Sequence, residues 1–255
     1  MAAVLSIAHT AFRESIRNRT LLGVLLLALA FIASALLLAE LSLDQRGRVV
    51  LDWGLFCVAV FGVGLAILMG VSQVHKEVRR KNLYVVLSRP IRRWQYVLGK
   101  YLGLALTLLV EVALMTAALL VLLAAEGAYP GLALWQALWL TAIEILLVAG
   151  IAVFFAAFTS PVLSGLFTLG MFLVGRSLPV IGQLADKTDQ PLLHGLLLGL
   201  RWGLPDLSAF NLAPRVVHEL PIAWAEVGWS SLYGLGYLVL LLFLAAWIVS
   251  RRDLT

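Results

Sequence analysis

Residues 74–103 read VHKEVRRKNLYVVLSRPIRRWQYVLGKYLG, and this stretch decides the fold because it places a dense basic loop between two long apolar runs. It contains eight Lys or Arg residues and a single acidic residue, Glu77. A short loop rich in Lys and Arg between two apolar runs is typical of the cytoplasmic side of a membrane protein. The stretch therefore predicts a cytoplasmic loop that joins two membrane-spanning helices.

The composition of the whole chain agrees with a lipid environment. Hydrophobic residues make up 62% of the 255 residues, and the mean hydropathy is +0.99, which leaves too little polar surface to cover a water-soluble globule. A helix needs about 20 mostly apolar residues to cross a bilayer. Six segments qualify: 21–41, 53–74, 101–125, 131–158, 162–181 and 227–249. We predict an all-α integral membrane protein with six transmembrane helices.

The distribution of basic residues predicts the orientation. An even number of spans places both termini on one side, and cytoplasmic flanks are enriched in Lys and Arg. Of the 19 Lys and Arg residues, 13 fall on the side of the basic loop: Arg13, Arg17, Arg19, Lys76, Arg79, Arg80, Lys81, Arg89, Arg92, Arg93, Lys100, Arg251 and Arg252. The other six, Arg46, Arg48, Arg176, Lys187, Arg201 and Arg215, are expected outside. We therefore expect a multi-pass protein of an inner membrane with cytoplasmic termini, and the basic pI reflects topology rather than nucleic-acid binding.

The chain reads as a single transmembrane domain, residues 1–255, because it shows no internal repeat and no Pro- or Ser-rich linker. Ahead of the first span, Leu5, Ala8, Phe12 and Ile16 recur at helical spacing, with charged residues on the other side. Such a helix lies in the headgroup layer of the membrane. We predict an interfacial amphipathic helix at residues 4–20.

Residues 182–226 are expected to form an external re-entrant segment. They contain the run LLHGLLLGLRW at 192–202, which is too short to cross a bilayer and is interrupted by Gly195 and Gly199. Irregular backbone at membrane depth is tolerated only where protein or water covers it. This segment is therefore expected to cap the external mouth of a cavity.

The sequence offers little support for an enzyme. The only Gly-Lys pair, Gly99-Lys100, is followed by Tyr101 instead of Ser or Thr, so a phosphate-binding loop is missing. Zinc-protease helices, paired Cys/His sites and a Ser/His/Asp set with plausible spacing are also missing. We expect no catalytic residues, no metal site and no cofactor bound by this chain, which is then not an ATPase by itself.

The basic loop itself, residues 75–97, looks like two short helices. The first is predicted from about residue 73 to 87, and a break at Ser88-Arg89-Pro90 separates it from a second helix that runs into the third span. The first helix shows an apolar stripe that includes Leu83 and Leu87. Exposed in this way, it suits docking into a groove of another protein, although a loop held to anionic lipid by its charge is the alternative.

The run from Glu77 through Leu83-Tyr84-Val85-Val86-Leu87-Ser88-Arg89-Pro90 to Arg93, Tyr96 and Gly99-Lys100 resembles the cytoplasmic loop of ABC exporter permeases of the second type. In motifs the resemblance rests on this one loop, whereas in topology it covers nearly the whole chain. The family includes the permease of the nitrous oxide reductase maturation system, which the chain resembles in layout.

The resemblance implies a coupling helix around Glu77 that seats in a cleft of a separate ATP-hydrolysing subunit. The residues implied in coupling are Lys76, Glu77, Arg79, Arg80, Leu83 and Leu87. It also implies two ATPase subunits, which carry the ATP and Mg, and a second permease copy or a paralogue. Glu77 is the one carboxylate of the basic stretch and suits a basic site on the partner, but an ion pair with Arg80 or Lys81 is the alternative.

Two carboxylates lie inside predicted spans, Glu111 near the middle of the third and Glu144 at the middle of the fourth. A charge at mid-bilayer costs about 2.5–3.5 kcal/mol on insertion scales, so such residues face a bundle interior, a partner or water. Both are candidates for a translocation path or a proton relay. A protonated carboxyl that hydrogen-bonds to Thr107, Thr116 or Thr141 is the structural alternative, and it is favoured.

The sequence thus favours the permease subunit of an ATP-driven ABC exporter, which couples ATP hydrolysis by a separate subunit to substrate movement across the membrane. Two other functions stay open. One is a proton- or ion-driven secondary transporter that uses Glu111 and Glu144, which the missing repeat symmetry disfavours. The other is a non-transporting scaffold that relays ATPase motion to an external partner through the segment after Gly182.

Overall fold

The computed structural model describes residues 2–42, 45–80, 93–128, 131–187 and 190–251. These residues form α1 (Ala2–Ile16), α2 (Arg19–Ala33), α3 (Ala35–Glu40), α4 (Arg46–Arg80), α6 (Arg93–Ala125), α7 (Leu132–Ala156), α8 (Pro161–Arg176), α9 (Leu178–Asp186), α10 (Pro191–Gly203), the short 3-10 helix η1 (Ser208–Phe210), α11 (Ala213–Val217) and α12 (Trp224–Arg251). No strand occurs among them. The all-α prediction is confirmed.

Within the described residues, five helical stretches are long and apolar enough to cross a membrane. They are Arg19–Glu40, Arg46–Gln73, Trp94–Ala125, Leu132–Ala156 and Trp224–Val249. They match five of the six predicted spans. The remaining span, predicted as one helix over residues 162–181, is a pair of helices, α8 and α9, bent by 58° at Ser177.

The bend has a chemical cause in Pro179, which lies in the first turn of α9. Proline has no N–H to donate to the carbonyl four residues earlier, so a helix cannot continue through it without losing a hydrogen bond. That carbonyl belongs to Gly175, and it accepts instead from the Leu207 N–H at 3.1 Å. The end of α8 is therefore closed by a distant segment of the chain, and the fifth span stops there.

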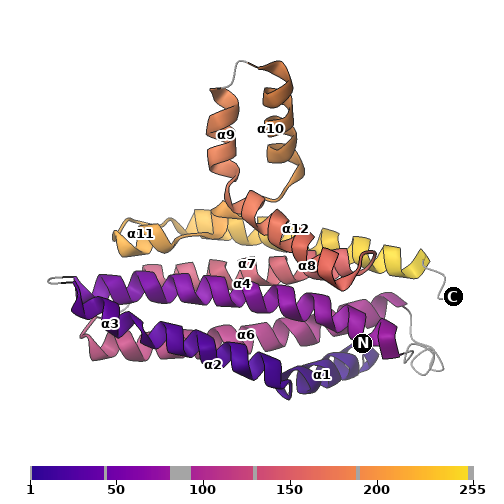
Figure 1. Ribbon diagram of the computed structural model, residues 1–255, viewed down its shortest axis with the longest axis horizontal. Helices are drawn as coiled ribbons and strands as arrows, with labels where there is room; N and C mark the ends of the chain where they lie inside the picture. The colour runs from indigo at the N-terminus through magenta and orange to yellow at the C-terminus, as the bar shows by residue number, and fades with distance from the viewer. Residues whose placement is uncertain (1, 43–44, 81–92, 129–130, 188–189, 252–255) are drawn as a thin grey trace.

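The long helices lie side by side, with α7 at the centre (Figure 1). About 67% of the apolar window of α7 is buried, and its side chains contact α4 on one side and α12 on the other. The start of α1 and the end of α12 lie at the end of the bundle where α4 ends and α6 begins (Figure 1). The described ends of the chain and the two helix ends that flank the basic loop thus share one end of the molecule, as the parity of the spans predicts.

Helix α1 packs against the first turns of α6, and two glycines make this possible. A Cβ atom at Gly99 would lie 2.9 Å from Ile7, and one at Gly103 would lie 2.6 Å from the carbonyl oxygen of Ala8 and from Ala11. The predicted apolar residues Leu5 and Ile16 stay exposed, as residues facing lipid would. The side that contacts protein was not predicted.

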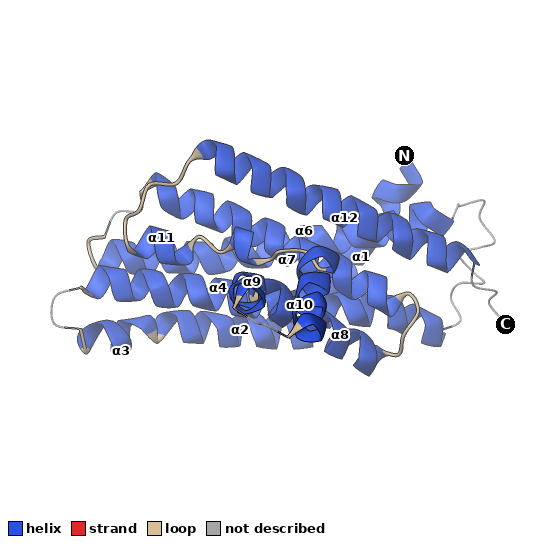
Figure 2. Cartoon of the chain, turned by 90° about the horizontal axis from the view of Figure 1, so that it is seen from above, coloured by secondary structure: helices blue, strands red, loops and turns tan. Residues whose placement is uncertain are grey.

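Helices α9 and α10 form a hairpin that leaves the bundle sideways, about halfway along its length (Figure 1). Figure 2 shows both helices end-on, so the hairpin stands nearly perpendicular to the long helices. After α10 the chain returns to the bundle, where η1 contacts α7 and α11 contacts α4 and α7. The predicted segment 182–226 thus has two parts, a lateral hairpin and a stretch that follows the bundle surface.

We predict that Gly103→Ala destabilises the protein, because the new methyl group would collide with backbone of α1. Overpacking of this kind costs about 1–3 kcal/mol of the free energy of unfolding. Cys57 is the only cysteine and is buried, so a maleimide dye that reacts with it reports thermal unfolding in detergent. Gly64→Ala is the matched control, since a Cβ at Gly64 meets no atom within 4 Å. Equal unfolding midpoints for the two variants would contradict the α1–α6 packing described here.

Candidate functional site

The basic end of α4 holds most of the residues predicted to couple to an ATPase. Lys76, Glu77, Arg79 and Arg80 belong to the last turns of α4, which continues without interruption from Arg46 to Arg80. A separate short helix was predicted from about residue 73 to 87, but residues 73–80 continue α4 without a break. Leu83 and Leu87 lie outside the described residues.

Helices α1, α4 and α6 meet just inside this basic end. A pocket of about 30 Å³ between them is lined by Glu14, Met69, Gln73 and Lys100, among other residues. The side-chain oxygen of Gln73 is buried there without a hydrogen-bond partner. The last buried turns of α4 are thus packed against the N-terminal helix and the start of α6, so the three helices share one junction.

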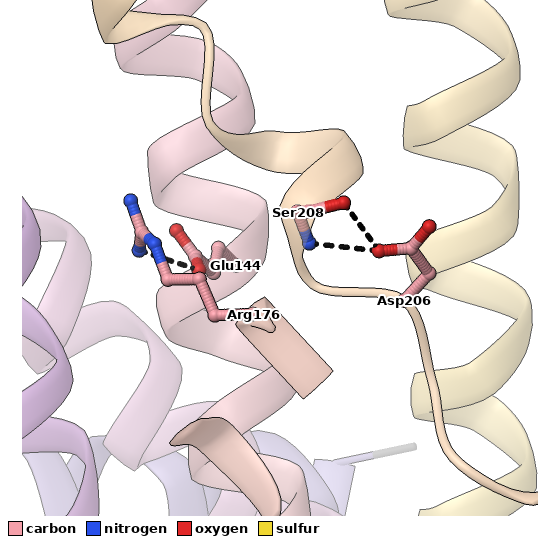
Figure 3. Close-up of polar contacts among 4 residues, drawn as sticks. All are labelled: Glu144, Arg176, Asp206 and Ser208. Atoms are coloured by element: carbon pink, nitrogen blue, oxygen red, sulfur yellow. Dashed lines mark hydrogen bonds and ion pairs between the residues drawn. The ribbon is translucent and has the colours of Figure 1, made fainter. Parts of the chain in front are cut away.

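Glu144 lies midway along α7, and its side chain is almost fully buried, with 1% exposed. Its Oε1 accepts a hydrogen bond from the guanidinium of Arg176 at 2.8 Å (Figure 3). Arg176 is the last residue of α8 and keeps 27% of its side chain exposed. The partner of Glu144 is therefore a cation of the broken span.

This ion pair corrects the predicted position of Arg176. Arg176 was expected outside the membrane, whereas its guanidinium is bonded to Glu144, which lies midway along α7. The signal was present in the sequence, because an Arg and a Pro both lie inside the segment 162–181. What the sequence could not give is which helix faces Arg176, since 32 residues separate it from Glu144.

Glu111 lies on α6 and is buried, with 6% of the residue exposed. Its Oε2 has no hydrogen-bond partner. No hydrogen bond or ion pair joins Glu111 to Glu144, although α6 and α7 are in contact. The proposed threonine partners are buried nearby, but the Thr107 hydroxyl donates to the carbonyl of Gly103 at 2.9 Å. The two carboxylates are thus different: one is paired, and the other keeps an unused acceptor.

The segment that follows α10 holds the end of α8 in place. Asp206 accepts at Oδ1 from the N–H and the hydroxyl of Ser208, at 3.0 and 2.6 Å (Figure 3). The Asp206 N–H donates to the hydroxyl of Tyr233 on α12 at 2.8 Å. The return segment can approach the end of α8 this closely only because residue 175 is a glycine. A Cβ there would lie 2.8 Å from the carbonyl oxygen of Pro205. Both ends of the lateral hairpin are therefore fixed to the bundle beside Arg176.

A cleft of about 770 Å³ opens at the end of the bundle opposite to the basic loop. Its lining comes from the starts of α4 and α7, the end of α6 and the region of α11, and includes Arg46, Arg48, Leu134 and Glu219. Arg48 forms an ion pair with Glu219 at 3.0 Å across its edge. An external mouth is predicted at this end by the distribution of Lys and Arg.

We predict that Arg176→Met strongly destabilises the protein, because it leaves the carboxylate of Glu144 buried without its partner. Removing one member of a buried pair costs about 3–5 kcal/mol, whereas replacing both members costs much less. Unfolding midpoints read with the Cys57 dye should therefore partly recover in Glu144→Gln/Arg176→Met. Arg215→Met is the control, since the Arg215–Glu226 pair is about 40% exposed on both sides and such pairs contribute little. Glu144→Gln alone completes the comparison. If the shifts in unfolding midpoint of Arg176→Met and Glu144→Gln simply add up in the double variant, the pairing is contradicted.

The comparison with protein families now adds to this geometry. The family model described as an ABC-2 family transporter protein matches residues 5–254. No curated protein matches the chain. The match extends from α1 through α12 and so covers the basic end, the polar centre and the lateral hairpin alike. The chain therefore belongs to the ABC-2 transporter family, as a permease subunit of an ABC transporter.

Proposed function

We propose that this chain is the permease of an ATP-driven exporter, and that it receives the motion of a separate ATPase through the basic end of α4. The family match supports the permease role. The proposed contact residues are Lys76, Glu77, Arg79 and Arg80 on α4, with Leu83 and Leu87 beyond it. The ATP and Mg would be bound by the partner, in line with the missing phosphate-binding loop of this chain.

The observation that supports this coupling most strongly is the continuity of α4. It has 35 residues, and a rise of 1.5 Å per residue makes it about 50 Å long. Helix α6 continues for 33 residues from the other side of the basic loop. A force applied at Glu77 would therefore act on two rigid rods that pass through the whole bundle, and closure of an ATPase dimer would tilt them together.

Two permease copies, or one copy and a paralogue, would complete the transporter with two ATPases. The clustering of both chain ends with the basic loop supports cytoplasmic termini in an inner membrane. The cleft at the opposite end, lined by Arg46 and Arg48, is then the external opening of the permease. Substrate movement from the cytoplasm to this opening is the proposed direction.

Within the bundle we assign different roles to the two carboxylates. Glu144 is proposed to be structural, because Arg176 already neutralises it. Glu111 is the better candidate for a polar point on a translocation path, because its Oε2 is buried without a partner. The same unpaired oxygen favours a second function, a proton-driven transporter that needs no ATPase and uses Glu111 as its proton carrier.

We predict that Glu77→Ala uncouples the permease from its ATPase. Truncating a charged residue at an interface costs about 1 kcal/mol or more, so the ATPase should bind roughly fivefold more weakly. The measurement is vanadate-sensitive ATP hydrolysis, together with the ATPase retained on the tagged permease in mild detergent. Glu40→Ala is the matched control, since Glu40 is an exposed carboxylate at the other end of the bundle.

Full ATPase retention and turnover with Glu77→Ala would remove the assigned role of Glu77. A permease that purifies without any ATPase would instead favour the proton-driven function. In that case Glu111→Gln should abolish transport, whereas the exporter hypothesis expects ATP hydrolysis to continue in this variant.

A further inference from the structure

The hairpin of α9 and α10 is called the lateral arm below. Hydrogen bonds fix its base to the bundle, and side-chain contacts join its two helices. At the base, Gly175 and Leu207 are joined by a backbone hydrogen bond of 3.1 Å. Between the two helices, a ring nitrogen of His194 lies 2.9 Å from the carbonyl oxygen of Ala185, and the guanidinium of Arg201 lies against Gly182. The arm is therefore a defined structural element with a fixed direction.

The direction of the arm places it within the plane of the membrane. Its base adjoins Arg176, which is paired with Glu144 midway along α7. The arm stands nearly perpendicular to the long helices in Figures 1 and 2. Because those helices cross the bilayer, the arm extends sideways near mid-depth, where the surroundings of a lone bundle are hydrocarbon.

The charges of the arm do not suit hydrocarbon. Asp186 and Lys187 are exposed at its tip, Arg201 is exposed nearer its base, and Arg176 beside the base is partly exposed. Charged side chains within a membrane almost always face a protein interior or a watery cavity. The sides of the arm, by contrast, are apolar and exposed, with Leu192 and Leu196 exposed by 78% and 59%, which suits contact with lipid or with another apolar surface. The charged ends of the arm therefore need a covering surface of protein, or water, around them.

We propose that this surface is the lateral arm of a second copy of the same chain, packed antiparallel to the first. The inference rests on the proposed pairing of permeases and specifies where the pairing occurs. In an interface with two-fold symmetry, residue i of one copy contacts residue j of the other, and the reverse contact is also made. The tip carries Asp186 and Lys187, and the base region carries Arg201 and Asp206. An antiparallel arrangement lets Asp186 of each copy face Arg201 of the other, and Lys187 face Asp206, so complementary charges can meet at both ends.

Photo-crosslinking in native membranes tests the position of the contact. A benzophenone amino acid at residue 192 or 196 should give a covalent dimer on irradiation, with both crosslinked peptides derived from this chain. The matched control is residue 26, which is 66% exposed and belongs to α2, a helix on the side of the bundle away from the arm (Figure 1). Crosslinks from both arm positions to lipid or to another protein would overturn the proposal, as would an equally strong dimer from residue 26.

Charge exchange tests the pairing of tip with base. Asp186→Arg alone and Arg201→Asp alone would each place like charges opposite one another in both contacts, so each should lower the dimer yield roughly tenfold or more. When the two variants are co-expressed with different tags, both contacts between unlike copies become complementary. The mixed dimer should then recover, whereas the two homodimers should stay weak. Recovery cannot come from within one chain, because neither copy carries both substitutions.

The same membranes separate this inference from the proposed function. If an ATPase co-purifies with the chain but the arms do not crosslink to each other, the arm contact is wrong and the permease role stands. If the arms crosslink and no ATPase is present, the arm contact stands and the exporter function is wrong. A mixed pair of charge variants that stays as weak as the homodimers would overturn the antiparallel arrangement.

Discussion

The ion pair between Glu144 and Arg176 is the interaction on which the middle of this molecule depends. It joins the most buried helix, α7, to the last residue of α8. Each charge alone would be costly at this depth, so neither Glu144 nor Arg176 can lose its partner without a large penalty. Because the pair lies beside the bend at Ser177, it fixes the point where the fifth span leaves the bundle. The lateral arm and the return segment up to η1 both begin from this point.

A second feature of the molecule is the continuity of the helices at its basic end. Helices α4 and α6 are continuous from the basic loop through the bundle, and α1 is packed onto α6 at two glycines. A helix keeps all its backbone hydrogen bonds internal, so it can tilt as a unit in lipid without exposing polar groups. A permease whose energy comes from ATP hydrolysis on a separate subunit requires helices that transmit motion, and it does not require catalytic side chains.

The sequence predicted what depends on local pattern. Apolar length located five spans, and the even number of predicted spans placed the start of α1 and the end of α12 at the end of the bundle where α4 ends and α6 begins. The prediction of an uninterrupted span over residues 162–181 was wrong. Arg176 and Pro179 both lie in this segment, and a charge and a proline both disfavour a continuous membrane-spanning helix. The partner of Glu144 and the contacts of Gly103 could not be read from the sequence, because they depend on which helix faces which. The sideways direction of the arm could not be read from the sequence either. It depends on the hydrogen bond from the Leu207 N–H to the Gly175 carbonyl, which joins residues far apart in the chain.

The most direct test of a permease driven from its basic end is an electron cryomicroscopy structure of the complex taken from its native membrane into lipid nanodiscs. It should show two ATP-hydrolysing subunits seated against the ends of α4 in two permeases, with Glu77 in the contact. A chain that stands alone, or an ATPase bound at the end of the bundle that carries Arg46 and Arg48, would contradict this function.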